Sequence, residues 1–567
     1  MGSEGTARTG GTPASTGAVG AEHAGDATSP PGGERRSWTP LVCLFLAQVL
    51  MAFNLAALPV SLGGMVADFG APPTAVSGTI VAYGLVVAAL VMTGAKVGAR
   101  LGWTRVFRVA VAAFGASAVV MVLAPAVGWA VGAQVLAGAA AAVIVPSLVA
   151  LIAEHYRGAQ QATAVGSLGS ARALAGVSAF LLGGALGSLV GWRPVFGVVL
   201  AVAVAVLVLS GRLRPDRGDP GVRVDVVGAV LVAAAVVLVT LGVQNLRTWG
   251  LLLASRHAPF DVLGVSPAPV LVLTGLVLGQ AFVAWTRRRA ATGRTPLVAL
   301  SVLGSPRERA AVYAMFVVVA LEAALNFTVP LYVQIVQGRS PFDTALAMMP
   351  FNLTVLVTAT LVVRLYPRFA PRSIGVVAFG LTTVALLWLS LVVTNNWETL
   401  PTVLGLVVFG VGQGALVTLV FNVLVTSAPK RQAGDVGAIR GTTQNLASAV
   451  GTALAGALLV TVLGATVARA VAAEPALPPA LVAQVDLDEV DFVSNADLRT
   501  VLERTTATPE QVDAAVALNE AARLDALRLG LLVLAGVSAS AVLPASRLPR
   551  YRPGEIPDPA GGPDPAT

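Results

Sequence analysis

Charged side chains are rare within the long apolar stretches of this sequence, so those that occur there are the first candidates for chemistry. Glu322 lies in the apolar stretch 310–335, and it is the only carboxylate that we place deep inside such a stretch. A carboxylate in an apolar environment is costly unless it is paired, and it can take up a proton near neutral pH instead. Glu322 is therefore a candidate for reversible proton binding, with a structural hydrogen bond or ion pair between helices as the alternative.

Two other polar side chains are expected near Glu322. Asn326 follows four residues later, which places both side chains on one face of a helix. Arg172 lies about ten residues into the stretch 162–189, and a direct ion pair with Glu322 would favour the charged carboxylate. Alternatively, the Arg172 side chain extends along its helix until the guanidinium reaches water.

The elements that must position these residues are membrane-spanning helices. The chain has 567 residues, of which 56% are hydrophobic and 12% are charged, and its mean hydropathy is +0.80; soluble chains average about 25% charged residues. About 20 apolar residues cross a bilayer as a helix, and the alternation of a membrane β-barrel is absent. We predict an all-α membrane protein with fourteen transmembrane helices, at residues 39–63, 75–98, 106–124, 129–153, 162–189, 194–211, 226–246, 268–286, 310–335, 342–366, 373–394, 401–427, 437–465 and 526–546.

The cations between these helices set the expected orientation. They gather in alternate connections, such as those at 96–105, 212–223, 287–309 and 430–431. Cytoplasmic connections of membrane proteins carry an excess of arginine and lysine, so we expect these connections and both termini on the cytoplasmic side of the plasma membrane. The net charge of +8 follows from the same rule, and the scattered cations do not form the basic face that nucleic-acid binding needs.

The helix pattern also predicts the domain organisation. The expected parts are a disordered cytoplasmic tail (1–37), an N-terminal six-helix bundle (38–212), two linker helices with cytoplasmic loops (213–309), a C-terminal six-helix bundle (310–546) and a second cytoplasmic tail (547–567).

The largest predicted extracytoplasmic segment, residues 466–525, belongs to the C-terminal bundle and is acidic. Within it, the sequence TPEQ at 508–511 has a helix-start pattern, with Thr508 as the cap and Gln511 three residues later. We expect short soluble helices there, either as a solvated cap or as a substrate-recognition domain.

Several classes of site are excluded by the residues present. The chain has one cysteine, Cys43, and its histidines lie outside the cores of the predicted helices, so neither a disulfide nor a metal cluster is expected. No phosphate-binding loop of the Walker type occurs. The stretch GVGQG at 410–414 lacks the strand–helix context of a dinucleotide site. We predict no enzymatic activity, no metal and no cofactor.

Small residues recur four apart within the predicted helices, in GGALG at 183–187, in GVGQG and in GAIRG at 437–441. This spacing lets membrane helices approach each other closely.

Five stretches together resemble the major facilitator superfamily, and within it the fourteen-helix drug:proton antiporter family. They are KVGARLGWTR (96–105), QVLAGAAAAVIVPS (134–147), GWRPVF (191–196), VPLYVQIVQGRSP (329–341) and PKRQAGDVGAIRGTTQN (429–445). The resemblance covers about residues 38–546 and implies a 6+2+6 helix arrangement with a substrate site between two bundles.

The sequence departs from the family pattern at positions linked to gating and coupling. The acid of the loop between helices 2 and 3 is Ala99, and the arginine of helix 4 is Gln134. The Gly-Pro of helix 5 is Ala179-Phe180, and helix 1 offers Asn54 in place of an acid.

The resemblance also implies where the remaining site residues lie. Helices 1, 4, 9 and 12 line the cavity in this family, which makes substrate-cavity candidates of Asn54, Gln134, Arg172, Asn326, Gln413 and Asn422. Helix 13 crosses the interface between the bundles, and the gating candidates on it and on the loop between helices 2 and 3 are Lys96, Arg100, Arg105, Asp435, Arg440 and Gln444. Interfacial anchoring is the alternative role of Arg440 and Gln444.

These observations predict a secondary transporter that exports hydrophobic or cationic small molecules by proton antiport, with Glu322 as the candidate proton-coupling group. Its expected partners are the small-molecule substrate, protons and the lipid bilayer; neither nucleic acid nor an oligomer is required. The alternative is an uncoupled facilitator or a transporter-like scaffold that has lost proton coupling, which the missing family acids favour.

Overall fold

The computed structural model describes residues 37–549, apart from 72, 157, 251, 257, 262, 334–340, 395–398, 427–432, 474–494 and 505–506. The described part of the chain is built of helices, with one isolated β-bridge between Leu253 and Val265. The predicted cations Lys430 and Arg431 lie outside the described residues, as do residues 474–494 and 505–506 of the acidic segment.

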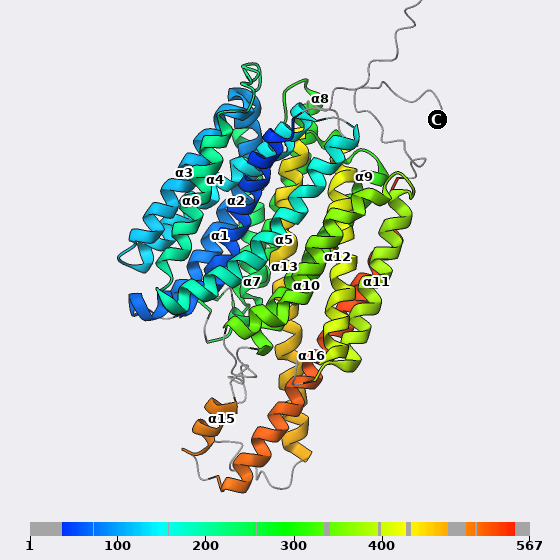
Figure 1. Cartoon of the computed structure of the whole chain (residues 1–567). Helices are drawn as coiled ribbons and strands as arrows, with labels where there is room; N and C mark the ends of the chain where they lie inside the picture. The colour runs from blue at the N-terminus through cyan, green and yellow to red at the C-terminus, as the bar shows by residue number, and fades with distance from the viewer. Residues whose placement is uncertain are drawn as a thin grey trace, which may run out of the picture. The chain divides into compact units, whose positions relative to one another are not determined.

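The first half of the chain forms eight long helices (Figure 1). They are α1 (Thr39–Phe69), α2 (Pro73–Leu101), α3 (Trp103–Leu123), α4 (Val127–His155), α5 (Gly158–Leu189), α6 (Arg193–Ser210), α7 (Val226–Trp249) and α8 (Pro267–Ala291). Among α1 to α6, α2 packs along α4, α1 along α5, and α3 along both α4 and α6. Helices α7 and α8 pack along each other, and α7 also contacts α2 and α13.

The second half holds the remaining helices. They are η1 (Leu300–Leu303), α9 (Pro306–Leu331), α10 (Pro341–Leu361), η3 (Val362–Leu365), α11 (Pro371–Val392), α12 (Leu400–Thr426), α13 (Ala433–Ala473), α15 (Asn495–Leu502) and α16 (Pro509–Ala545). Helix α13 packs along α9 and α16, and α11 packs along α12 and α16.

Each of the fourteen predicted membrane helices has a counterpart among the long helices. Thirteen spans in the described chain are long and apolar enough to cross a membrane, and α13, with 41 residues, corresponds to the remaining prediction.

The expected start of the last membrane helix at residue 526 is wrong. The capping box at Thr508 and Gln511 forms as predicted, but it opens α16 rather than a separate soluble helix. Residues 512–526 contain neither proline nor glycine, so nothing interrupts the helix. Helix α16 therefore runs through 37 residues.

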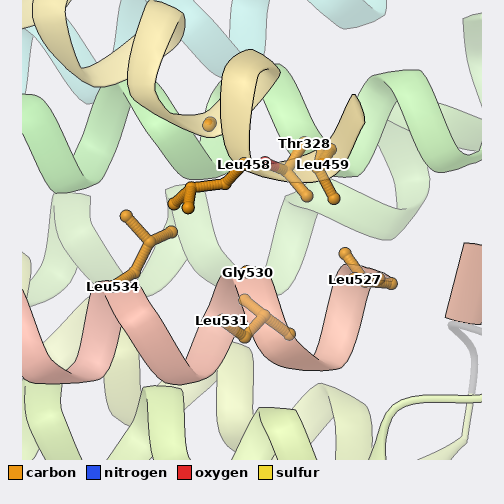
Figure 2. Close-up of a pocket in the computed structure, with 8 residues that line it drawn as sticks. Thr328, Leu458, Leu459, Leu527, Gly530, Leu531 and Leu534 are labelled. Carbon is orange, nitrogen blue, oxygen red and sulfur yellow. The ribbon is translucent and has the colours of Figure 1, made fainter. Parts of the chain in front are cut away.

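The packing of α9, α13 and α16 encloses a small apolar cavity (Figure 2). One polar residue, Thr328, lines this cavity. The other lining residues are Ala455, Leu458, Leu459, Leu527, Gly530, Leu531 and Leu534. Its volume of about 10 Å³ is the room of roughly one water molecule, so it is a packing defect rather than a substrate site.

The two halves of the chain meet through α5 with α10 and α12, and through α13 with α2 and α4. Close approach at α13 depends on the glycines of GAIRG. A Cβ at Gly437 would lie 2.7 Å from Pro146 Cα, and one at Gly441 would lie 2.8 Å from a methyl carbon of Val91. The small-residue spacing therefore brings α13 against the first half of the chain, as expected.

Candidate functional site

Helices α5 and α9 bring Arg172 and Glu322 together. Arg172 Nη2 lies 3.3 Å from Glu322 Oε1, and the two side chains are 26% and 16% exposed. The direct pair that the sequence allowed is thus confirmed, and the extension of Arg172 towards water is not what the structure has. The second carboxylate oxygen, Oε2, is buried with no hydrogen-bond partner among the described residues.

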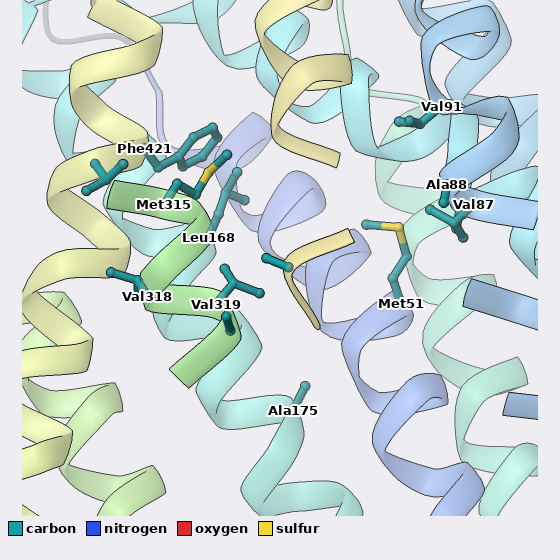
Figure 3. Close-up of a cluster of buried hydrophobic side chains, with 14 of the residues drawn as sticks. Met51, Val87, Ala88, Val91, Leu168, Ala175, Met315, Val318, Val319 and Phe421 are labelled. Carbon is teal, nitrogen blue, oxygen red and sulfur yellow. The ribbon is translucent and has the colours of Figure 1, made fainter. Parts of the chain in front are cut away.

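Buried apolar side chains of α5, α9 and α12 form a layer, and those of α5 and α9 lie next to the pair in sequence (Figure 3). Leu168 and Ala175 of α5 flank Arg172 in sequence by one turn on either side, and Met315 and Val319 of α9 precede Glu322. Phe421 of α12 completes this side of the layer. Apolar surroundings strengthen the electrostatic interactions of the charges that they enclose.

Arg440 of α13 is the second cation of this region. It is buried, with 7% of its surface exposed, and its guanidinium carbon lies 3.9 Å from the centroid of the Phe421 ring. Its charge is close enough to that of Arg172 for the two to repel each other. Arg172, Arg440 and Glu322 together therefore carry one net positive charge when Glu322 is ionised.

Asn54 and Gln134 bind each other. Asn54 Nδ2 donates to Gln134 Oε1 over 2.9 Å, and Gln134 Nε2 donates to Asn54 Oδ1 over 3.5 Å. Both residues are buried, so at the positions where the family has charges this chain has a neutral contact between α1 and α4.

The other predicted cavity residues differ in burial. Asn326 is exposed, one turn beyond Glu322 on α9, and Gln444 is half-buried. Gln413 and Asn422 are buried on α12. Neither amide atom of Gln413 has a hydrogen-bond partner in the part of the chain that the structure describes, which leaves this amide free to bind another polar group.

Lys96 and Asp435 join the end of α2 to the start of α13. Lys96 Nζ donates to the two carboxylate oxygens of Asp435 over 2.9 and 3.1 Å, and the backbone N–H of Ala299 donates to Asp435 Oδ2 over 2.9 Å. The two side chains are 13% and 9% exposed. One carboxylate thus ties α2, α13 and the segment before η1 together at what we call the α2–α13 end of the molecule.

The indole of Trp103 lies at the same end, between α2 and α13. A Cβ at Gly98 would lie 2.3 Å from this ring, and a Cβ at Gly434 would lie 2.5 Å from it. The predicted gating residues Arg100 and Arg105 are exposed on either side of Trp103, and no ion pair of either is found among the described residues.

The loop between α2 and α3 has an acid that sequence reasoning missed. Asp216, in the connection between α6 and α7, accepts hydrogen bonds from the backbone N–H of Trp103 over 2.8 Å and of Gly218 over 2.9 Å. The N–H of Asp219 donates to the carbonyl of Ala99 over 2.9 Å. A carboxylate therefore stands beside the loop although residue 99 is alanine, and the aspartates of this arginine-rich connection were the only signal for it.

The described residues contain no group of three or more His, Cys, Asp and Glu side chains that could hold a metal ion. The chemistry that the arrangement can support is the binding and release of a proton at Glu322 and the binding of a charged group by the two arginines.

A sequence model of the Major Facilitator Superfamily matches residues 44–452. The chain belongs to this superfamily. It is accordingly a multi-pass membrane transporter with the fourteen-helix major facilitator fold, and not an enzyme.

Two relatives match most of this transporter. The probable actinorhodin transporter of Streptomyces coelicolor is 28% identical over 454 residues, which cover 78% of this chain and 75% of that protein. The multidrug efflux pump LfrA of Mycolicibacterium smegmatis is 28% identical over 435 residues, which cover 75% of this chain and 81% of that protein.

Among solved structures, the human organic anion transporter MFSD10 superposes with a TM-score of 0.55. The superposition covers 91% of this chain and 100% of that chain, at 13% sequence identity. At this identity the likeness concerns the fold alone.

Proposed function

We propose that this chain exports small molecules with large apolar surfaces, driven by the entry of protons that bind at Glu322. The observation that carries the proposal is the Arg172–Glu322 pair between α5 and α9, with a carboxylate oxygen, Oε2, that is buried and has no hydrogen-bond partner among the described residues. The names of the relatives support the proposal: the multidrug efflux pump supports the outward direction, and both it and the probable actinorhodin transporter support a small-molecule substrate.

In the proposed cycle, the proton and Arg172 compete for the Glu322 carboxylate. A proton on Glu322 removes the charge that holds Arg172, and its loss restores the pair. Because α5 and α9 belong to different halves of the chain, making and breaking the pair biases the position of one bundle relative to the other. Sites of this kind sit at the middle of the bilayer, at the interface between the two repeats.

We also propose that the α2–α13 end faces the cytoplasm, with both termini on that side. The arginine-rich connections support this orientation through the positive-inside rule. The Lys96–Asp435 pair and the Trp103 ring between Gly98 and Gly434 support a state that is closed at that end.

Purified protein in proteoliposomes with an imposed pH gradient tests the proposal. The wild type should move a hydrophobic fluorescent dye uphill in response to the gradient, and Glu322→Gln should abolish uphill movement while keeping downhill exchange of the dye. Glu503→Gln, at an exposed position, is the matched control and should behave as the wild type. Gradient-driven uphill transport by Glu322→Gln would show that another group couples the proton.

The second candidate function is that of an uncoupled facilitator. It is favoured by the neutral Asn54–Gln134 contact, which stands where the family has charges. In that case the wild type exchanges the dye downhill but shows no response to the pH gradient, and Glu322→Gln behaves as the wild type.

A further inference from the structure

Arg440 differs from the other interface cations named above in having no carboxylate partner. Arg172 pairs with Glu322 and Lys96 pairs with Asp435, whereas no acidic side chain in the described chain lies within ion-pair distance of Arg440. Its guanidinium lies over the Phe421 ring and is repelled by the charge of Arg172. A buried charge without a counter-ion is strongly unfavourable, so a bound anion would stabilise the charge of Arg440.

The geometry of Arg440 leaves its hydrogen-bonding groups available. A guanidinium that lies over an aromatic ring gains a cation–π attraction through its face, while its N–H groups remain at its edge. That edge matches a carboxylate, which a guanidinium binds through two parallel hydrogen bonds. Gln444 follows one turn later on the same face of α13 and offers an amide to the same ligand.

The side chains around Arg440 indicate the chemistry of the uncharged part of such a ligand. The Phe421 ring beneath the guanidinium continues into the apolar layer of Leu168, Met315 and Val319 (Figure 3). These side chains are buried in the structure, so a molecule that places an anionic group at Arg440 meets them when the two bundles move apart during alternating access. Glu322 is held by Arg172, and no ion pair between Glu322 and Arg440 is found in the described part of the chain.

We propose that the substrates of this transporter are amphipathic organic anions, which pair their anionic group with Arg440 and place their apolar body in the layer around Phe421. This inference rests on the transport part of the proposed function and not on the proton coupling at Glu322. It keeps the expected apolar body of the substrate but replaces the expected positive charge with a negative one. An inside-negative membrane potential itself favours the outward movement of such an anion.

A series of probes that share one apolar body and differ in charge tests the substrate class. Pyrene-1-carboxylate, pyrene-1-carboxamide and pyrene-1-methylammonium carry a negative, a zero and a positive charge at neutral pH. Binding to the purified full chain in lipid nanodiscs, followed by pyrene fluorescence, should be tightest for the carboxylate. Arg440→Gln should weaken carboxylate binding by about tenfold or more, as expected for a lost charge-assisted hydrogen bond, and leave carboxamide binding unchanged.

Three variants separate a binding role from a structural one. Arg440→Lys keeps the positive charge but cannot form two parallel hydrogen bonds with a carboxylate. Its affinity for pyrene-1-carboxylate should therefore lie between those of the wild type and Arg440→Gln. Arg294→Gln removes an exposed arginine outside the proposed site and the gate and should leave all three affinities unchanged. Phe421→Leu should weaken all three probes, because it removes part of the apolar surface.

Several outcomes would overturn the inference. They are tightest binding of the ammonium probe, equal binding of all three probes, no binding of any probe, and an equal loss of all three affinities in Arg440→Gln. If Arg440→Gln does not fold, the affinities of the three probes for the wild type and for Arg440→Lys decide whether the site prefers an anion. Transport of the fluorescent dye in proteoliposomes is measured separately, so a failed anion preference is distinguished from a failure of transport itself.

Discussion

Asp216 is a single side chain that holds two segments of backbone. Its carboxylate accepts one hydrogen bond from Trp103, the first residue of α3, and another from Gly218 in its own connection. A helix leaves its first N–H groups without partners inside the helix, and a carboxylate at that terminus is favoured by the helix dipole. Asp216 therefore stabilises the start of α3 and fixes the α6–α7 connection against the α2–α3 loop.

Asp216→Ala should lower the stability of the protein. The backbone N–H groups of Trp103 and Gly218 lose a charged acceptor, and losses of this kind cost about 1–3 kcal/mol. The melting temperature of the detergent-purified protein measures the effect. Asp219→Ala is the matched control, because Asp219 is exposed and its side chain bonds only two residues ahead, to Gly221; an equal loss in both variants would refute the role assigned to Asp216.

The sequence predicted the contact between Arg172 and Glu322, because this contact depends mainly on how far along its membrane helix each residue lies. Arg172 and Glu322 lie at comparable positions in helices expected to start from the same side, and they form the pair. Asp216 was out of reach because it meets Trp103 across 113 residues, and only the folded connection brings the two together. The absence of a counter-ion for Arg440 was equally invisible, since it depends on which side chains every neighbouring helix directs towards α13.

At the scale of helices, α2 and α13 approach each other with Trp103 between them. The ring fits because Gly98 and Gly434 have no side chains; a Cβ at either position would fall within 2.5 Å of a ring atom. The contact lies in the first turn of α13, next to Asp435, where the two halves of the transporter meet.

Gly434→Ala should displace Trp103 and open the α2–α13 end. The methyl group meets the ring rather than a flexible chain end, so either the indole or α13 must move. In a variant with Cys43→Ser, a reporter cysteine at Val149, a fully buried residue of α4 that faces Gly437, should react faster with a water-soluble maleimide after this substitution.

Gly84→Ala provides the control for that experiment. It adds the same methyl group to α2 at a position with no neighbour within 4 Å, so reporter labelling should stay at the wild-type rate. An unchanged rate in Gly434→Ala as well would mean that Trp103 does not hold the two helices together.

The sequence predicted the helices of this fold better than their ends. All fourteen membrane helices could be located in the sequence, because long apolar stretches are separated by arginine-rich or proline-containing connections. The end of a helix is decided by local capping instead, and the continuous α16 shows the consequence. Its polar first turns, from Pro509 onwards, belong to the same helix as its apolar end, because helix propensity continues across a change in polarity.

At the scale of the whole molecule, several contacts between the two halves lie near the α2–α13 end. Asp435, in the first turn of α13, accepts hydrogen bonds from Lys96 and from the backbone N–H of Ala299. Gly437 and Gly441 of the same helix lie against Pro146 and Val91, respectively. On the other side, Gly63 of α1 is exposed with no neighbour within 4 Å of a Cβ built on it. Alternating access requires the contacts at the closed end to break as the far end closes.

Asp435→Asn should therefore shift the molecule towards the state that is open at the α2–α13 end. The amide oxygen can still accept the Ala299 N–H, but the charge that holds Lys96 is lost, and Lys96 is left partly buried. A bias of about 1.4 kcal/mol changes the ratio of two states tenfold, so labelling of a cysteine at position 149 should rise and labelling of one at position 63 should fall.

Exchange of the two charges distinguishes the ion pair from the backbone bond. Lys96→Asp combined with Asp435→Lys restores an attraction between α2 and α13, but a lysine at 435 has no acceptor for the Ala299 N–H. The double variant should recover only part of the wild-type labelling pattern, whereas each single substitution should label position 149 strongly. Full recovery would assign the closure to the ion pair alone, and no recovery would assign it to the bond between Asp435 and Ala299, which ties α13 to the segment leading into the second bundle.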